Sequence, residues 1–132
     1  MAYTTYAAFV TAVASISITG VARSYTSPPP QIAELPASYP RLPQLEREVV
    51  AFGGASGIDN GTVEIVFLIE SAMQNLNSTN FATMTALVDT IDTAYAANTL
   101  SAGIDRWTIR QEQEEFGDTV FWALVATVEG SG

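Results

Sequence analysis

The side chains that most often carry out catalysis are missing from this sequence. It contains no histidine, cysteine or lysine, and its five basic residues are all arginine: Arg23, Arg41, Arg47, Arg106 and Arg110. This chain therefore cannot form a Ser-His-Asp or Cys-His nucleophile system, a Schiff base, a zinc site with His or Cys ligands, or a P-loop with its lysine. We predict that it is not an enzyme, and we expect no cofactor and no metal.

Carboxylates are the chemical groups that remain. Glu112, Glu114, Glu115 and Asp118 lie close together and could supply a general acid–base pair or bind a hard cation. Their spacing is not that of a metal-binding loop. A carboxylate-dependent hydrolase stays an alternative, and it would need two of these groups in a desolvated cleft where one keeps its proton.

A glycine-rich segment follows the middle of the chain. Gly53, Gly54 and Gly57 suggest a phosphate-binding loop, but no lysine follows them and the spacing is neither the Walker nor the dinucleotide pattern. We interpret residues 53–61 as a flexible loop whose Asn60-Gly61 end favours a hairpin turn.

The charge balance is strongly acidic. Fourteen acidic residues give a net charge of -9, so electrostatics oppose contact with nucleic-acid phosphates and anionic membranes. No segment approaches the roughly 20 apolar residues of a membrane-spanning helix. We expect a soluble protein that neither enters a membrane nor binds DNA specifically.

Apolar periodicity predicts two helices in a single domain, residues 1–132, whose 48% hydrophobic content is enough for a core. Residues at three- and four-residue spacing mark one helix from Tyr6 and a second that ends near Asn98. These residues are Phe9, Val10, Val13 and Ile16 in the first helix, and Phe81, Met84, Leu87, Val88, Ile91 and Tyr95 in the second.

Other segments predict strands. Thr62–Glu70 is apolar on both faces and should be central, while Ile104–Glu115 and Thr119–Glu129 flank a turn and should form a long hairpin. Val21–Tyr25 favours a loop or an edge strand, and Glu46–Phe52 favours a further strand. The prolines of the segment from Ile32 to Pro43 favour an extended arm over a central strand.

The predicted fold class is therefore α+β. It has a mixed or antiparallel sheet of about four to five strands, two helices packed on one face, and a long C-terminal hairpin. Both faces of residues 120–128 are apolar, so a partner could cover one of them.

Period-two alternation places two arginines and then two glutamates on one face of the first hairpin strand, with Trp107 and Ile109 on the other. A row with both signs of charge suits a self-complementary or ring interface, although a solvated face would show the same pattern. Our candidate interface residues are Arg106, Arg110, Glu112 and Glu114, the prolines Pro28, Pro29 and Pro30 of the extended arm, and Gly53, Gly54 and Gly57 of the loop.

One resemblance covers nearly the whole chain in element order. An opening helix leads into residues Gly20 to Tyr25, then a Pro-Pro-x-x-Ile segment and Leu35-Pro36-Ala37, then two strands, a helix and a final hairpin. This order resembles the tail terminator proteins of long-tailed, siphophage-like bacteriophages.

The resemblance implies a structural protein of the virion, located in the tail or neck and assembled in the host cytoplasm. Such a subunit forms a hexameric ring on the tail tube protein, stops tube polymerisation, and joins the neck and head-completion proteins. DNA would pass through the ring without specific binding, and an acidic channel suits this because carboxylates repel phosphates.

Two further alternatives remain open. Another phage neck or tail-completion connector would share the structural role but differ in stoichiometry and partner. A small module that binds a ligand or peptide would use the residue 28–43 arm and the 53–61 loop as a groove beside the sheet.

Overall fold

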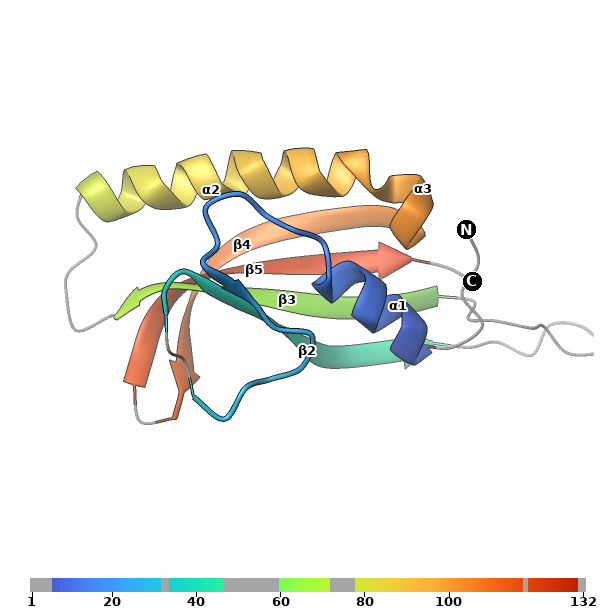
Figure 1. Cartoon of the computed structure of the whole chain (residues 1–132), viewed down its shortest axis with the longest axis horizontal. Coiled ribbons are helices and arrows are strands. Elements are labelled where there is room, and N and C mark those ends of the chain that lie inside the picture. Colours follow the sequence, from blue (N-terminus) through green and yellow to red (C-terminus); the bar gives the residue numbers. More distant parts are fainter. Residues whose placement is uncertain (1–5, 32–33, 47–59, 72–77, 118, 131–132) are drawn as a thin grey trace, which may run out of the picture.

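A five-stranded sheet with helices on one face organises the protein (Figure 1). The structure is a computed structural model, and it describes residues 6–31, 34–46, 60–71, 78–117 and 119–130. The elements in chain order are α1 (Tyr6–Ala14), β1 (Arg23–Ser24), β2 (Ala37–Glu46), β3 (Asn60–Ser71), α2 (Ser78–Ala97), α3 (Thr99–Ala102), β4 (Ile104–Phe116) and β5 (Thr119–Gly130). The predicted α+β class is confirmed.

The sheet is mixed, with the strand order β1-β2-β3-β5-β4. Strands β2, β3, β5 and β4 are antiparallel neighbours, and the two-residue β1 runs parallel to the start of β2. Strand β3 lies between β2 and β5, as the apolar character of both its faces predicted. The C-terminal hairpin is also confirmed, and its strands differ from the predicted ranges by a residue at their far ends.

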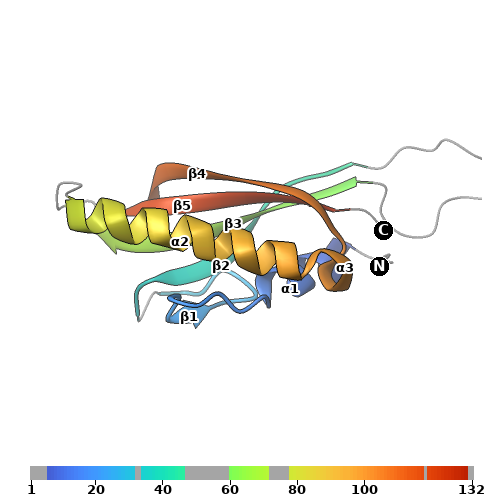
Figure 2. The same ribbon diagram turned by 90° about the horizontal axis from the view of Figure 1, so that it is seen from above.

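The main core lies between the helices and one face of the sheet, and Figure 2 shows α1 and α2 on that side. Helix α2 contributes Met84, Leu87, Ile91 and Tyr95, whose three- and four-residue spacing forms one buried stripe. The Trp107 indole on β4 donates a hydrogen bond to Asp92 Oδ1 at 2.9 Å, which ties the outer flank of α2 to the sheet.

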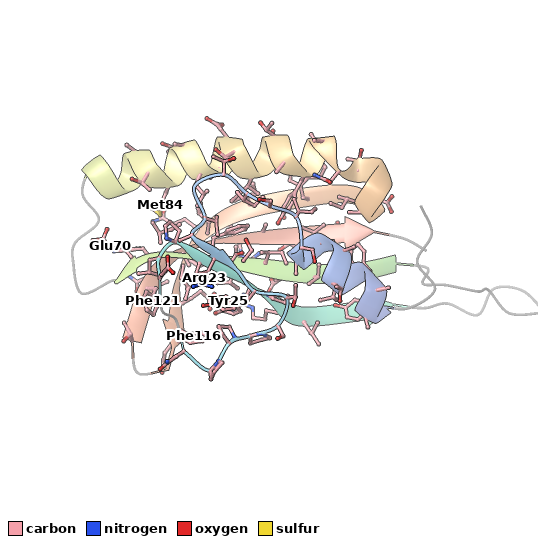
Figure 3. All side chains as sticks on the ribbon, viewed as in Figure 1. Arg23, Tyr25, Glu70, Met84, Phe116 and Phe121 are labelled. Carbon is pink, nitrogen blue, oxygen red and sulfur yellow. The ribbon has the colours of Figure 1, made fainter. Side chains whose placement is uncertain are left out.

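A second, smaller core occupies the opposite face. Val66 and Leu68 of β3 and Ala123 and Val125 of β5 are fully buried there, with Tyr39 of β2 beside them. Phe116 and Phe121 near the turn of the β4–β5 hairpin, and Tyr25 directly after β1, add partial cover (Figure 3). The chain itself therefore buries the second apolar face of residues 120–128.

The second core requires the sheet to curl. The Tyr39 and Phe116 rings lie 5.3 Å apart between centroids, although β2 and β4 are separated by β3 and β5 in the sheet. The far half of the hairpin must therefore bend back over the face that carries Tyr39, as Figure 1 shows at the turn.

The prediction of an extended arm in place of a central strand is wrong for residues 37–43, because the sheet includes them. These residues form most of β2, which pairs with β3 from Ala37 to Glu46 across a bulge between Arg41 and Gln44. Strand β1 pairs only with Ala37 and Ser38 of β2. Beyond Ser38, the side of β2 that faces away from β3 has no neighbour among the described strands, and Pro40 and Pro43 lie in this part. Proline is compatible with such an edge and with a bulge because it has no N–H to donate.

Two other predictions also need correction. The strand expected at Glu46–Phe52 does not start at Glu46, because Glu46 is the last residue of β2; residues 47–52 lie outside the described residues. Asn60 and Gly61 are not a turn, since they begin β3 and pair with Glu46 and Leu45. Periodicity also missed α3, which ends at Gly103 in the left-handed conformation with φ 65.

Close packing at the end of β5 gives a first prediction. A Cβ added at Gly130 would overlap the Gly103 carbonyl oxygen and the buried Phe9 ring. We expect Gly130→Ala to lower the free energy of unfolding by about 1–3 kcal/mol, the usual cost of overpacking, as measured by urea unfolding. Gly117→Ala is the control: nothing lies within 4 Å of the added Cβ, so only the left-handed backbone penalty of about 1 kcal/mol applies. A smaller loss at Gly130 than at Gly117 would contradict this account.

Candidate interaction surface

Five charged side chains form a closed network on the concave face of the sheet. Arg41 donates to Glu64 Oε1 through Nε at 2.8 Å and to Glu114 Oε2 through Nη1 at 2.7 Å. Arg110 donates to Glu64 Oε2 through Nη2 and to Glu112 Oε1 through Nε, both at 2.8 Å. A longer contact of 3.9 Å between Arg41 Nη2 and Glu112 Oε2 closes the ring. We call these residues the arginine–glutamate network.

Strand register and curl together assemble this network. Arg41 lies directly opposite Glu64 in the β2–β3 ladder, and period-two alternation puts Arg110, Glu112 and Glu114 on one face of β4. Arg110 reaches across β5, where it also donates to the Thr127 hydroxyl at 2.7 Å. Only the curl of the hairpin brings Glu114 to Arg41, which is 73 positions away in the chain.

Glu64 is the centre of the network. Its side chain is 15% exposed and accepts hydrogen bonds from both arginines. Burial by itself would raise the pKa of Glu64, but the hydrogen bonds from Arg110 and Arg41 outweigh it and hold the pKa below its usual range. Glu64 therefore stays ionised at neutral pH and holds β2 and β4 to β3 through its two partners.

Glu112 and Glu114 differ in their electrostatics. The hydrogen bond from Arg110 lowers the pKa of Glu112, whereas burial, followed by the hydrogen bond with Glu112, raises the pKa of Glu114 in spite of Arg41. Opposite shifts in neighbouring carboxyls are what an acid–base pair needs. Here arginines bind oxygens of both groups, and this geometry suits a structural network better than catalysis.

The predicted charged stripe does lie on one face of β4, but its charges pair within the chain. Arg110, Glu112 and Glu114 belong to the arginine–glutamate network. Arg106 forms a separate ion pair of 2.8 Å with Glu129 of β5. Sequence reasoning missed Arg41 and Glu64 as members of this surface. The signal was available for Glu64, since it is a carboxylate set inside the apolar run of the central strand.

The remaining candidate interface residues, the prolines and the glycines, are not part of the arginine–glutamate network. Pro28 and Pro30 are exposed and Pro29 is half-buried, in a segment without helix or strand. An exposed ion pair of 3.1 Å between Arg23 and Glu34 spans this segment. Gly53, Gly54 and Gly57 lie outside the described residues.

Several large apolar side chains are exposed on separate elements. Leu42 of β2 is 67% exposed and Phe81 of α2 is 54% exposed, while Leu35 and Val120 are exposed to a lesser degree. A groove of about 150 Å³ runs between α2 and β4 beside Phe81. Two larger grooves on the other flank of α2, of about 390 and 380 Å³, are lined mainly by Ser, Thr and Ala side chains.

Neither a protein-family model nor a curated protein matches this sequence. Among the described residues, no three His, Cys, Asp or Glu side chains are grouped so that they could hold a metal ion. None of the helices in the described ranges is long and apolar enough to cross a membrane.

The network gives a prediction about stability. Arg41→Ala would leave Glu64 and Glu114 each short of a charged donor, and both carboxylates are only 15% exposed. We expect a loss of about 1–2 kcal/mol in the free energy of unfolding at pH 7. The matched control is Arg23→Ala, which removes an exposed pair with side chains 57% and 52% exposed and should cost less than about 0.5 kcal/mol. Equal losses in urea unfolding of the two variants would show that the network does not stabilise the fold.

The opposite pKa shifts predict opposite pH dependence. Because the pKa of Glu64 is lowered in the folded state, its contribution is full above the unfolded pKa and is lost as pH falls through the folded value. Glu64→Gln should therefore destabilise most near pH 7, and its deficit should shrink in acid. The raised pKa of Glu114 means that folding disfavours its charge, so Glu114→Gln should cost less than Glu64→Gln at pH 7. Unfolding curves from pH 3 to 7 would test this, and a larger loss for Glu114→Gln at pH 7 would contradict it.

Proposed function

We propose that this chain is a non-enzymatic structural subunit that acts by assembling with copies of itself and with neighbouring proteins. Among such subunits, we propose a tail terminator of a long-tailed bacteriophage, which closes the tail tube as a hexameric ring within the virion. A different neck or tail-completion connector is the nearest alternative, and the bound partner and the stoichiometry distinguish the two.

The element order supports this proposal. A first helix, a short edge strand, a β2–β3 antiparallel pair, a long helix and a C-terminal hairpin follow one another in the order that resembles the tail terminator proteins. Residues 20–31 and 34–36, which carry the Gly-Val and proline motifs, lie between α1 and β2 in the chain and contain only the two-residue β1.

The charged groups of the concave face also favour a structural role. The arginine–glutamate network links β2, β3 and β4, and Arg106–Glu129 links β4 to β5. These side chains therefore hold strands together. A subunit of a mechanical assembly needs such a rigid body, since its contacts must keep their geometry under load.

The observation that carries the ring proposal is the placement of the exposed apolar side chains. Leu42 projects from β2, on one side of the sheet order, and Val120 lies beside the hairpin turn between β5 and β4. A ring requires head-to-tail contacts in which two different patches of each subunit meet. Exposed apolar side chains at two separate places are compatible with such contacts, whereas one self-complementary site would favour a twofold dimer.

Acidity suits the proposed passage of DNA. The net charge of -9 repels phosphates, and a channel lined by carboxylates would let a duplex slide instead of holding it. The proposed partners are accordingly proteins: the tail tube protein on one side and neck or head-completion proteins on the other.

We predict that six copies of the 14.1 kDa protomer assemble on a tail tube as a ring with sixfold symmetry in negative-stain images. Leu42→Ser should reduce ring formation but leave the free energy of unfolding unchanged within about 0.5 kcal/mol, since the side chain is mostly in solvent. Deletion of residues 27–30 should likewise impair assembly more than folding.

One control variant and two contradicting outcomes define this experiment. Thr93→Ser changes an exposed residue of α2 by a methyl group and should assemble like the wild type. A protein that remains monomeric at all concentrations and does not associate with tail tubes would contradict the proposal. An unchanged ring after deletion of residues 27–30 would contradict the role of the proline segment.

A further inference from the structure

Strand β4 has an edge that invites pairing with another strand. In the described sheet it is the last strand in the order, it pairs with β5 on one side, and its 13 residues include no proline. The β2 edge differs, because Pro40 and Pro43 interrupt its hydrogen-bonding groups and β1 pairs with its start. Strand addition to this sheet is therefore favoured at β4.

The charge order along β4 allows a self-complementary antiparallel register. With a twofold axis at Gln111, Arg110 lies opposite Glu112 of a second copy, and Glu112 lies opposite its Arg110. Thr108 then lies opposite Glu114, and no two like charges face each other directly. A shift of the axis to Arg110 would instead oppose two arginines, which is unfavourable in a cross-strand pair.

Arg110 keeps capacity for a second carboxylate. Its guanidinium has five N–H donors, and the bonds to Glu112, Thr127 and Glu64 use three of them. The side chain is 41% exposed, so a carboxylate from outside can reach it. The arginine–glutamate network and an intermolecular pair can therefore coexist.

The groove beside β4 supplies apolar area at the same place. Phe81 and Val88 of α2 line it together with Ile109 and Gln111 of β4. An axis at Gln111 sets the grooves of the two copies side by side. The exposed Phe81 ring of each copy would then be covered by the other, which accounts for a large apolar side chain that is otherwise more than half in solvent.

From the open edge, the charge order and the adjoining groove, we propose that two copies of this chain pair antiparallel through β4 about a twofold axis at Gln111, with Phe81 at the centre of the apolar contact. This pairing is isologous, unlike the head-to-tail contacts of a ring. It is independent of the proposed function and describes how free subunits associate in solution.

The absence of native cysteine makes the register measurable. Residues that face each other across an antiparallel pair have Cα atoms about 4.5–5.5 Å apart, within the range of a disulfide. We expect Gln111→Cys to form a cross-linked dimer quickly under mild oxidation at micromolar protein concentration. Gln113→Cys is the matched control, because this position is also exposed. In the proposed register residue 113 faces Ile109 of the second copy. The two thiols of this variant would therefore be too far apart to react.

Light scattering of the cysteine-free protein completes the test. We expect a species of twice the protomer mass whose dissociation constant rises about tenfold in Phe81→Ser, as for a central apolar contact, with Thr93→Ser unchanged. Equal cross-linking of the two cysteine variants, or a monomer at every concentration, would overturn the pairing. A sixfold ring without cross-linking at residue 111 would also overturn it and leave the proposed function intact.

Discussion

The contacts that Arg41 makes across the concave face require the sheet to be curled. From β2, its guanidinium binds carboxylates of both β3 and β4, so it joins strands that are not neighbours. A flat sheet would keep β2 and β4 about 14 Å apart, three interstrand spacings, so the contact between Arg41 and Glu114 exists only in a curled sheet. The same curl brings Phe116 to Tyr39 and covers the second core, and the arginines offset the cost of burying Glu64.

The same geometry separates the surfaces through which the molecule can associate. Charges on the concave face are largely satisfied within the chain, whereas the β4 edge, the groove beside α2 and the exposed Leu42 are available to partners. Twofold pairing through β4 and head-to-tail contacts through other patches would use different surfaces. The function that we propose would place this acidic body around DNA without binding it.

The sequence alone determined the local structure and the excluded chemistry. Three- and four-residue spacing identified α1 and α2, apolar segments identified β3 and the hairpin, and period-two alternation identified the charged face of β4. The lack of His, Cys and Lys excluded most catalytic designs. Such features depend on neighbours in the chain, where periodicity is informative. The prolines of β2 misled the prediction because their effect depends on whether the strand lies at an edge, which is a property of the sheet.

Only the tertiary structure decided which charges meet. Arg41, Glu64 and Glu114 lie on three strands, and nothing in their spacing reveals strand order, register across β5 or the curl of the hairpin. Those features follow from burying both faces of β3 and β5 at once, a condition on the whole chain. The sequence thus determined which residues share a face, and the packing of the second core determined which faces came together.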